Sequence, residues 1–295
     1  MALITVKNLS MKAKDKEILK NISFEINEGE CLALIGPNGA GKTTLFKHLI
    51  GEYSATKENV ALMEKSADDT SLKNYVAILD QENAIPDKLK VKELIEFYQS
   101  IYKNHLTSSE IDDILKFSDK QKSQLVSKLS GGQKRFLVFV LKLIGKPKIL
   151  FLDEPTAAMD TATRIYFWQI VDSLKAKGTT IVYSSHYIEE VEHIAERILV
   201  LNKGVLVRDT TPYALKSEEL LKYVSVPKDY LEVVETLDKV TDIEIKSDNI
   251  SFATKDIEEV WQVLSNKGCK ISEIEIQNRS LLSAIFEETG GRENE

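Results

Sequence analysis

Cysteine and histidine are scarce in this sequence, which has 295 residues, two cysteines and four histidines. Neither Cys31 nor Cys269 belongs to a Cys-x-x-Cys pair or stands near a histidine at metal-binding spacing. This scarcity excludes a disulfide framework and a cysteine-based zinc site. Cys31 opens an apolar segment, and we expect it to be a buried, unreactive thiol in a reducing compartment.

Long apolar segments are also missing. The longest covers residues 136–144, is interrupted by Lys142, and is shorter than the about 20 residues that cross a bilayer as a helix. Residues 3–6 form a polar-flanked apolar segment without the charged-then-apolar plan of a signal peptide. We therefore expect any membrane role to come through a partner chain.

An excess of positive charge is the third absence. The chain has 39 Lys and Arg against 46 Asp and Glu, a net charge of -7. Broad binding to nucleic-acid backbones needs clustered Lys and Arg, so we expect no direct nucleic-acid partner, although a local basic patch is compatible with the composition. The 43% of apolar and 29% of charged residues are typical of a globular protein.

Apolar patterning predicts an α/β domain over residues 1–215. Strands and helices alternate in a way that indicates a mostly parallel sheet covered by helices, and helical periodicity dominates residues from about 82 to 128. We expect strands at residues 3–6, 22–26, 31–35, 75–79, 149–152 and 180–184, and helices at 43–50, 132–144 and 161–175.

A second, smaller α+β domain is expected over residues 222–289. The predicted order is strand, helix, two strands, helix and strand, which is the ferredoxin-like arrangement. These elements are expected at residues 223–226, 230–237, 242–245, 250–253, 257–264 and 271–276. A last helix at 281–288 and a flexible polar tail at 290–295 would follow.

A phosphate-binding loop is the first motif that carries chemistry. It fits G-x-x-x-x-G-K-[ST] between an expected strand and an expected helix, a context in which a plain glycine turn with a surface lysine is disfavoured. Backbone N–H groups would converge on phosphate oxygens, Lys42 would reach the β- and γ-phosphates, Thr43 would ligate Mg²⁺, and Thr44 would contact the α-phosphate. The loop consists of Gly36, Pro37, Asn38, Gly39, Ala40, Gly41, Lys42 and Thr43.

Two carboxylates end the apolar strand at residues 149–152. Asp153, at the strand end, can hold a hydrated Mg²⁺, and Glu154 can polarise an attacking water as a general base. By itself this pair fits a solvated loop equally well. Together with the loop at Lys42, it favours nucleotide hydrolysis.

The pentapeptide Leu-Ser-Gly-Gly-Gln at residues 129–133 completes a recognisable set. With these three motifs, residues 1–215 resemble the nucleotide-binding subunits of ATP-binding-cassette (ABC) transporters. The resemblance implies a P-loop NTPase cassette with an N-terminal antiparallel β subdomain and a helical subdomain at about 82–128. It also implies that two subunits enclose two ATP molecules, each held partly by the partner's pentapeptide. The pentapeptide groups that would face that ATP belong to Ser130, Gly131, Gly132 and Gln133.

The resemblance extends to three single residues. Gln81 corresponds to a glutamine that touches Mg²⁺ and water and responds to the membrane partner. Asp160 corresponds to an aspartate that crosses the dimer interface, after Met159 in place of the usual Leu. His186 corresponds to a histidine that contacts the γ-phosphate, although a lone histidine is more often structural. We interpret the remaining histidines, His48, His105 and His193, as structural or surface residues.

The chain departs from the family at the adenine. Relatives usually stack the base on an aromatic residue where this sequence has Ala13, and no aromatic lies between Thr5 and Asn21. Stacking is worth about 1–3 kcal/mol per base in nucleic-acid complexes. We therefore expect weaker ATP affinity and poorer discrimination from GTP than in relatives with the aromatic, with Met11 or Ile18 giving partial apolar contact.

These features predict an ATP-hydrolysing subunit with ATP and Mg²⁺ as cofactors, paired as a homodimer or a heterodimer. It would drive export through a separate membrane permease and lie peripherally on the cytoplasmic face of the membrane. Export rests on the small C-terminal domain, which ends in a helix containing residues 279–286 and resembles the C-terminal extension of bacterial drug-, peptide- and polysaccharide-exporter ATPases. That extension would serve either stability and dimer contact or regulation. The cargo is not specified by this chain.

The alternative is a soluble ABC-type ATPase acting on nucleic acid or ribosomes. Such proteins usually carry two cassettes, a coiled-coil insertion or a zinc insertion, whereas this acidic chain has one cassette and neither insertion. A non-hydrolysing regulatory subunit is disfavoured because Lys42, Asp153, Glu154 and His186 are all present.

Overall fold

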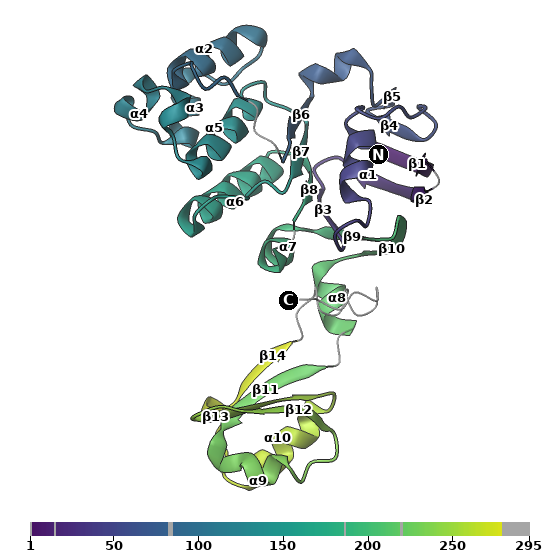
Figure 1. Cartoon of the computed structure of the whole chain (residues 1–295), viewed down its shortest axis with the longest axis vertical. Helices are drawn as coiled ribbons and strands as arrows, with labels where there is room; N and C mark the ends of the chain where they lie inside the picture. Colours follow the sequence, from purple (N-terminus) through teal and green to yellow (C-terminus); the bar gives the residue numbers. More distant parts are fainter. Residues whose placement is uncertain (1, 15, 82–84, 186, 219–220, 279–295) are drawn as a thin grey trace. The chain divides into compact units, whose positions relative to one another are not determined.

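The computed structural model describes residues 2–14, 16–81, 85–185, 187–218 and 221–278 (Figure 1). The chain divides into two compact units, Met1–Thr210 and Thr211–Glu295. Four sequence predictions lie outside the described residues: the role of His186, the exporter-like segment at 279–286, the helix at 281–288 and the tail at 290–295.

The first unit is built around a six-stranded sheet in the order β10-β9-β3-β8-β7-β6. All neighbours pair in parallel except β10 and β9, and every residue of β3 and β8 is buried. Such continuous burial is typical of a parallel sheet covered on both faces. The strands are β3 (Cys31–Ile35), β6 (Val76–Leu79), β7 (Ile149–Asp153), β8 (Thr180–Ser184), β9 (Arg197–Asn202) and β10 (Val205–Thr210).

The first unit also contains an antiparallel sheet in the order β2-β1-β4-β5. Its strands are β1 (Ala2–Ala13), β2 (Lys16–Asn27), β4 (Val60–Leu62) and β5 (Lys65–Ser66). Alternate residues of β2 are buried, including Ile22, Phe24 and Ile26, and they join one apolar core with β3 and the following helix. β1 and β2 are longer than the predicted segments 3–6 and 22–26, because their pairing continues to the hairpin between Ala13 and Lys16.

Helices cover the two faces of the six-stranded sheet (Figure 1). On one face, α1 (Lys42–Leu49) shares a core with Phe151 and Val182. On the other, α5 (Gly131–Leu143) and α6 (Thr161–Ala176) carry aromatic rings, and Trp168 contacts Tyr183 of β8 with ring centroids 4.9 Å apart. α7 (Ile188–Ile194) follows β8.

The segment expected to be helical contains α2 (Val91–Ile101), α3 (Ser108–Leu115) and α4 (Asp119–Ser123). Side-chain capping fixes where these helices begin: Thr107 with Glu110 caps α3, and Ser118 with Gln121 caps α4. Among the described helices, none has the length and apolar composition needed to cross a membrane.

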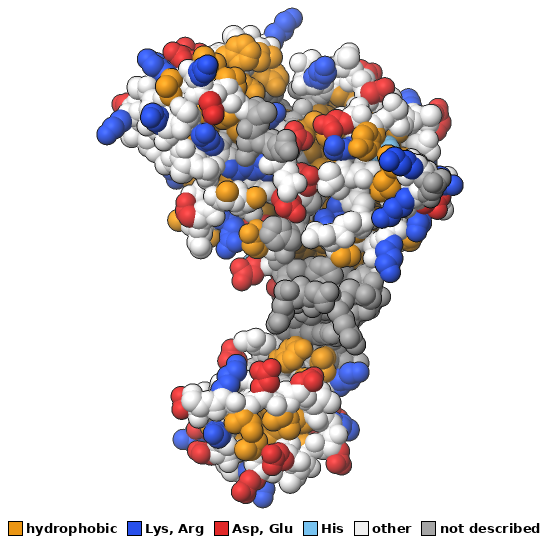
Figure 2. Space-filling model, viewed as in Figure 1, with side chains coloured by type: hydrophobic (Ala, Val, Ile, Leu, Met, Phe, Trp, Pro, Cys, Tyr) orange, Lys and Arg blue, Asp and Glu red, His pale blue; other side chains and the backbone are white. Residues whose placement is uncertain are grey.

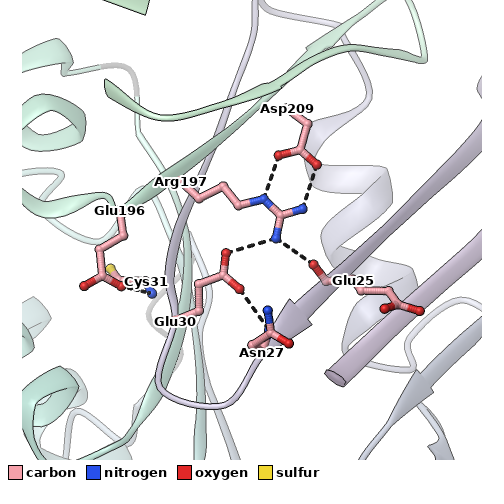
Figure 3. Close-up of polar contacts among 7 residues, drawn as sticks. All are labelled: Glu25, Asn27, Glu30, Cys31, Glu196, Arg197 and Asp209. Carbon is pink, nitrogen blue, oxygen red and sulfur yellow. Dashed lines mark hydrogen bonds and ion pairs between the residues drawn. The ribbon is translucent and has the colours of Figure 1, made fainter. Parts of the chain in front are cut away.

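Arg197 joins the β9–β10 hairpin to the turn that precedes β3 (Figure 3). Its Nε and Nη2 donate to the two carboxylate oxygens of Asp209 at 2.6 Å, and its Nη1 donates to Glu30 Oε1 at 3.0 Å and to the Glu25 carbonyl at 2.8 Å. This bidentate pair holds the end of β10, next to the boundary between the units. Nearby, burial raises the pKa of the Cys31 thiol to about 12, in agreement with an unreactive side chain.

The second unit has its own core and an antiparallel sheet in the order β12-β13-β11-β14. Its elements are α8 (Pro212–Glu218), β11 (Lys222–Pro227), α9 (Leu231–Val234), β12 (Val240–Ile245), β13 (Asn249–Thr254), α10 (Ile257–Asn266) and β14 (Glu275–Asn278). Apart from α8, this is a split β-α-β arrangement.

Two predictions of elements in the second unit were wrong in detail. The expected strand at 271–276 is instead a 3₁₀ helix at Ile271–Glu273 followed by β14, because the Lys270 N–H donates to the Glu273 carboxylate at 2.9 Å and closes a turn. The expected helix at 230–237 is reduced to α9 after a 3₁₀ turn at Lys228–Tyr230.

Candidate nucleotide-binding site

The phosphate loop runs from the end of β3 to the start of α1, and its first position, Gly36, has space only for glycine. A Cβ atom at Gly36 would lie 2.1 Å from the Leu201 carbonyl oxygen, and the φ of Gly36 is +154°. Gly41, with φ +107°, is the residue before α1. Both positions favour glycine: a Cβ would collide with the Leu201 carbonyl at Gly36 and crowd Leu19 at Gly41, and the positive φ would strain any other residue.

Lys42 stands at the first position of α1 and its ammonium group turns toward the loop. Its Nζ donates to the carbonyl oxygens of Gly36 at 2.7 Å and Pro37 at 3.2 Å. Burial lowers the pKa of Lys42, and the nearby charges of Glu154 and Asp153 oppose that shift. A half-buried ammonium beside a loop of amides suits a polyanionic ligand, and the two carboxylates suit a cation bound with it.

A cavity of about 910 Å³ collects most of the residues selected from the sequence. From the loop and α1 it is lined by Asn38, Gly39, Gly41, Lys42, Thr43 and Thr44. Gln81, Asp153 and Glu154 complete this part of the wall, although β6, β7 and the loop are far apart in the sequence. The carboxyl ends of parallel strands meet at one edge of a sheet, which is why these segments converge.

The cavity continues along β2, where the sequence predicted only a partial apolar contact of Met11 or Ile18 with the base. There it is lined by Lys16, Glu17, Ile18 and Lys20, and by Lys203 from the turn between β9 and β10. Figure 2 shows that Lys and Arg side chains also gather on the surface over this side of the first unit. Ala13 is exposed and does not line the cavity, and Met11 packs against the apolar core, so Ile18 is the apolar side chain available to a base.

The acidic pair is held by β8. The Ser184 hydroxyl donates to Asp153 Oδ1, and the Glu154 N–H donates to Ser184 Oγ at 2.9 Å. Burial raises the pKa of Asp153, the charges of Glu154 and Asp80 add to this, and the Ser184 hydrogen bond and Lys42 oppose it. Glu154 has a left-handed backbone with φ 43°, so the chain turns sharply directly after Asp153.

The expected ligands of Mg²⁺ fit that ion in their chemistry. Thr43, Gln81 and Asp153 line the same cavity and offer a hydroxyl, an amide and a carboxylate oxygen. Within the described part of the chain, no cluster of three or more His, Cys, Asp or Glu could hold a metal by itself. A site with one carboxylate suits Mg²⁺, which binds with few protein ligands together with phosphates and water.

The pentapeptide lies outside the cavity. Ser130 is the N-cap of α5: its Oγ accepts from the Gln133 N–H at 3.2 Å, and its own N–H donates to Gln133 Oε1 at 3.0 Å. Ser130 and Gly131 are exposed, whereas Gly132 is buried against the Ala158 carbonyl of the loop before α6. The structure therefore does not bring these residues to the phosphate loop of the same chain.

Asp160 is also absent from the cavity lining. Its carboxylate caps α6, accepting from the Thr163 N–H at 2.9 Å and from the Thr163 hydroxyl at 2.8 Å. These hydrogen bonds lower the pKa of Asp160. Its side chain thus has a structural task in the single chain.

Sequence reasoning missed several residues that support the site. Ser184 holds the acidic pair, and the buried Glu190 accepts from the hydroxyls of Thr156 and Ser185, both at 2.6 Å. Arg135 is buried on α5 and binds the backbone beneath the cavity. The available signal was a single charged residue at the start of the apolar run 136–141.

Comparison with known proteins agrees with this geometry. The family model described as ABC transporter matches residues 19–157. The Nod factor export ATP-binding protein I of Burkholderia lata is 31% identical over 227 residues, which cover 75% of this chain and 74% of the relative. The protein of that name from Bradyrhizobium diazoefficiens is 30% identical over 212 residues, covering 70% and 69%.

Solved structures show the same fold. An ATP-binding subunit of an ABC transporter has a TM-score of 0.65 at 23% identity, covering 73% of this chain and 92% of that chain. A dimeric ATP-binding cassette bound to ADP and Pi in a post-hydrolysis state has a TM-score of 0.62 at 22% identity, covering 71% and 98%. The cassette fold expected from the sequence is confirmed, and the chain belongs to the ABC transporter family, as one of its ATP-binding subunits.

Proposed function

We propose that two such subunits, identical or related, enclose ATP between the phosphate loop of one and the pentapeptide of the other, and hydrolyse it to drive a membrane transporter. One observation carries this proposal. The loop, Gln81 and the acidic pair share one cavity, whereas the pentapeptide lies outside it, at the exposed N-terminus of α5.

Within the cavity each side chain has a task that its chemistry supports. Lys42 and the loop amides bind the β- and γ-phosphates, and Thr44 contacts the α-phosphate. Glu154 orients and deprotonates the attacking water, with Gln81 as a second contact to that water. When bound with Thr43, Gln81 and Asp153, Mg²⁺ supplies positive charge that offsets the charge of the phosphates.

The start of α5 remains able to bind a phosphate although it is capped. Ser130 uses an oxygen lone pair as the N-cap acceptor, and its hydroxyl hydrogen stays available to donate. Gly131 is exposed without a side chain to obstruct its amide, at the positive end of a helix of 13 residues. A phosphate presented by a partner subunit therefore meets two donors.

Export through a separate permease on the cytoplasmic face of a membrane is the transport role that we propose. Its support is the similarity to Nod factor export ATP-binding proteins and the absence of a membrane-spanning helix from the described residues. Asp160 and His186 are proposed to act at the interface and at the γ-phosphate, as their positions in the motifs indicate.

The experiment is a Ser130→Arg substitution assayed with the permease and any related ATPase subunit present. A bulky cation at the start of α5 blocks the partner's nucleotide, so turnover is lost, while ATP binding to the chain's own loop persists. Ser118→Arg is the matched control, because Ser118 caps α4 with Gln121 as Ser130 caps α5 with Gln133. Loss of ATP binding in the Ser130→Arg monomer would contradict action across an interface.

A further inference from the structure

Arg135 is a buried cation that does not touch the nucleotide cavity. Its side chain is 1% exposed, and it lies on α5 two residues after the pentapeptide. Among the described residues, Arg135 has the largest side chain that is fully buried. A charged group in such a position is costly unless the fold uses its hydrogen bonds.

The guanidinium donates to the backbone of two separate segments. Nη1 donates to the carbonyl oxygens of Asp80 and Gln81, the latter at 3.3 Å, directly after β6. Nη2 donates to the carbonyl oxygens of Asp153 at 2.9 Å and Glu154 at 3.2 Å.

Nε donates to the Pro155 carbonyl at 3.0 Å, one residue beyond the acidic pair. The rigid fork of arginine fixes the spacing of groups that it joins, which an ammonium cannot do. Three of these acceptors belong to Gln81, Asp153 and Glu154, which line the cavity.

Electrostatics keeps this cation in place. Burial lowers the pKa of Arg135 to about 10, and the charges of Asp153, Asp80 and Glu154 oppose the shift. An arginine guanidinium carries its charge at neutral pH, and this charge strengthens the hydrogen bonds with the carbonyl groups.

We propose that Arg135 is a positioning residue, which sets the distance between Gln81 and the Asp153–Glu154 pair and ties both to the helix that begins with the pentapeptide. The inference rests on the proposed function and extends it. The pentapeptide serves the partner's nucleotide and the acidic pair serves the chain's own, so Arg135 links the two nucleotides through one chain. A shift of α5 on contact with the partner's ATP moves the backbone of the catalytic residues with it.

Two substitutions test this role. Arg135→Met removes the donors and keeps an apolar side chain, and Arg135→Lys keeps charge without the fork. Because misplacement of catalytic groups by 1 Å can cost about 100-fold, we expect kcat to fall about 100-fold in Arg135→Met and about 10-fold in Arg135→Lys, after correction for the folded fraction. ATP affinity should change less than about threefold, because the phosphate loop makes none of these hydrogen bonds.

Lys134→Met is the matched control. Lys134 is adjacent on α5, and its Nζ pairs with Asp87 at 3.2 Å at the surface. Its loss should leave kcat within about twofold, as expected for a surface pair.

Mn²⁺ binding to the complex with a non-hydrolysable ATP analogue, followed by electron paramagnetic resonance, distinguishes positioning from general destabilisation. We expect about five- to tenfold weaker Mn²⁺ binding in Arg135→Met, because two proposed metal ligands lose their shared anchor. Unchanged Mn²⁺ affinity and wild-type kcat per folded molecule in both variants would overturn the proposal. If Arg135→Met does not fold, Arg135→Lys decides by the same criteria.

The readouts also separate this inference from the proposed function. A wild-type chain that never hydrolyses ATP with its partners present would refute the proposed function. The Mn²⁺ titration would still show whether Arg135 positions the ligands.

Discussion

Two helices of the first unit begin with glycine-containing segments, yet their N-termini are constructed differently. α1 begins after Gly41, and the described residues give it no side-chain cap. α5 begins after Ser130, and a reciprocal pair of hydrogen bonds with Gln133 satisfies two of its end groups. An uncapped start leaves its amides to a ligand, whereas a capped start is stable by itself.

The surroundings of the two helix starts differ in the same sense. The start of α1 lies in a cavity with carboxylates, an amide and basic residues, whereas the start of α5 is outside the cavity. The start of α1 thus lies in a nucleotide site that is open on one side. The start of α5 offers donors for a phosphate but has no such site beside it in the same chain. This difference supports the proposed pairing of two chains around each nucleotide.

The largest expected effect tests the chemistry on the α1 side. Glu154→Gln should lower turnover by about 10²–10⁴-fold, because the general base is lost, while ATP affinity stays within about threefold. Steady-state ATPase assays and equilibrium dialysis measure the two quantities. Glu96→Gln, an exposed carboxylate on α2, is the control that should behave as wild type. Normal turnover in Glu154→Gln would remove this residue from its role.

The two glycines of α5 sharpen the comparison on the other side. A Cβ at Gly132 would lie 2.9 Å from the Ala158 carbonyl oxygen, whereas a Cβ at Gly131 would lie 3.9 Å from its nearest neighbour, Ala158 Cβ. We expect Gly132→Ala to lower the free energy of unfolding by about 1–3 kcal/mol through overpacking.

Gly131→Ala should change the free energy of unfolding by less than about 0.5 kcal/mol. Its expected effect is on ATP turnover, and only when a partner subunit presents its nucleotide. Urea unfolding of the first unit with both variants measures the difference. Equal destabilisation would show that the two positions do not divide into an inner and an outer face.

A smaller effect is expected at the base. Ile18→Ala should weaken ATP and GTP binding by a similar factor of up to about tenfold, since each buried methylene is worth about 0.8 kcal/mol. Met11→Ala, which trims the core instead, should lower stability and leave the affinity of folded protein unchanged. Competition titrations with both nucleotides decide, and tight binding with strong preference for ATP in the wild type would contradict the loss of aromatic stacking.

The smallest effect concerns the strand that leads into the phosphate loop. Burial raises the pKa of Cys31 to about 12, and burial also raises the pKa of Cys269 in the second unit. Because burial disfavours the thiolate and shields both side chains, iodoacetamide at pH 8 should modify neither thiol in the folded protein. Both should react after unfolding, as mass spectrometry can show. Rapid labelling of Cys31 alone would indicate that β3 opens.

The loop at Lys42, the acidic pair and the pentapeptide could be found from the sequence because each is a contiguous motif between periodic elements. The strands before the loop and the acidic pair are short and apolar and end at these motifs, which made their ends clear. The fold places these motifs by parallel pairing, and that pairing follows from the alternation of strands and helices.

Other parts could not be found in this way. Arg135 donates to backbone carbonyl groups in segments 55 and 18 positions away. Every residue type has such a carbonyl, so the sequence does not mark these acceptors. Lys203 reaches the cavity through a hairpin whose turn is joined to β2 by the hydrogen bond from the Lys20 N–H to the Gly204 carbonyl. Such contacts depend on tertiary structure, and no local pattern encodes them.

The most direct measurement is the mass in solution of the Glu154→Gln protein with Mg²⁺ and ATP. With hydrolysis blocked, each nucleotide should stay between a phosphate loop and a partner's pentapeptide. Light scattering should therefore show a dimer. The dimer should dissociate when ATP is removed, and it should not form when the same chain also carries Ser130→Arg. A protein that stays monomeric at high concentration, alone and with its permease and any related ATPase subunit, would contradict the account.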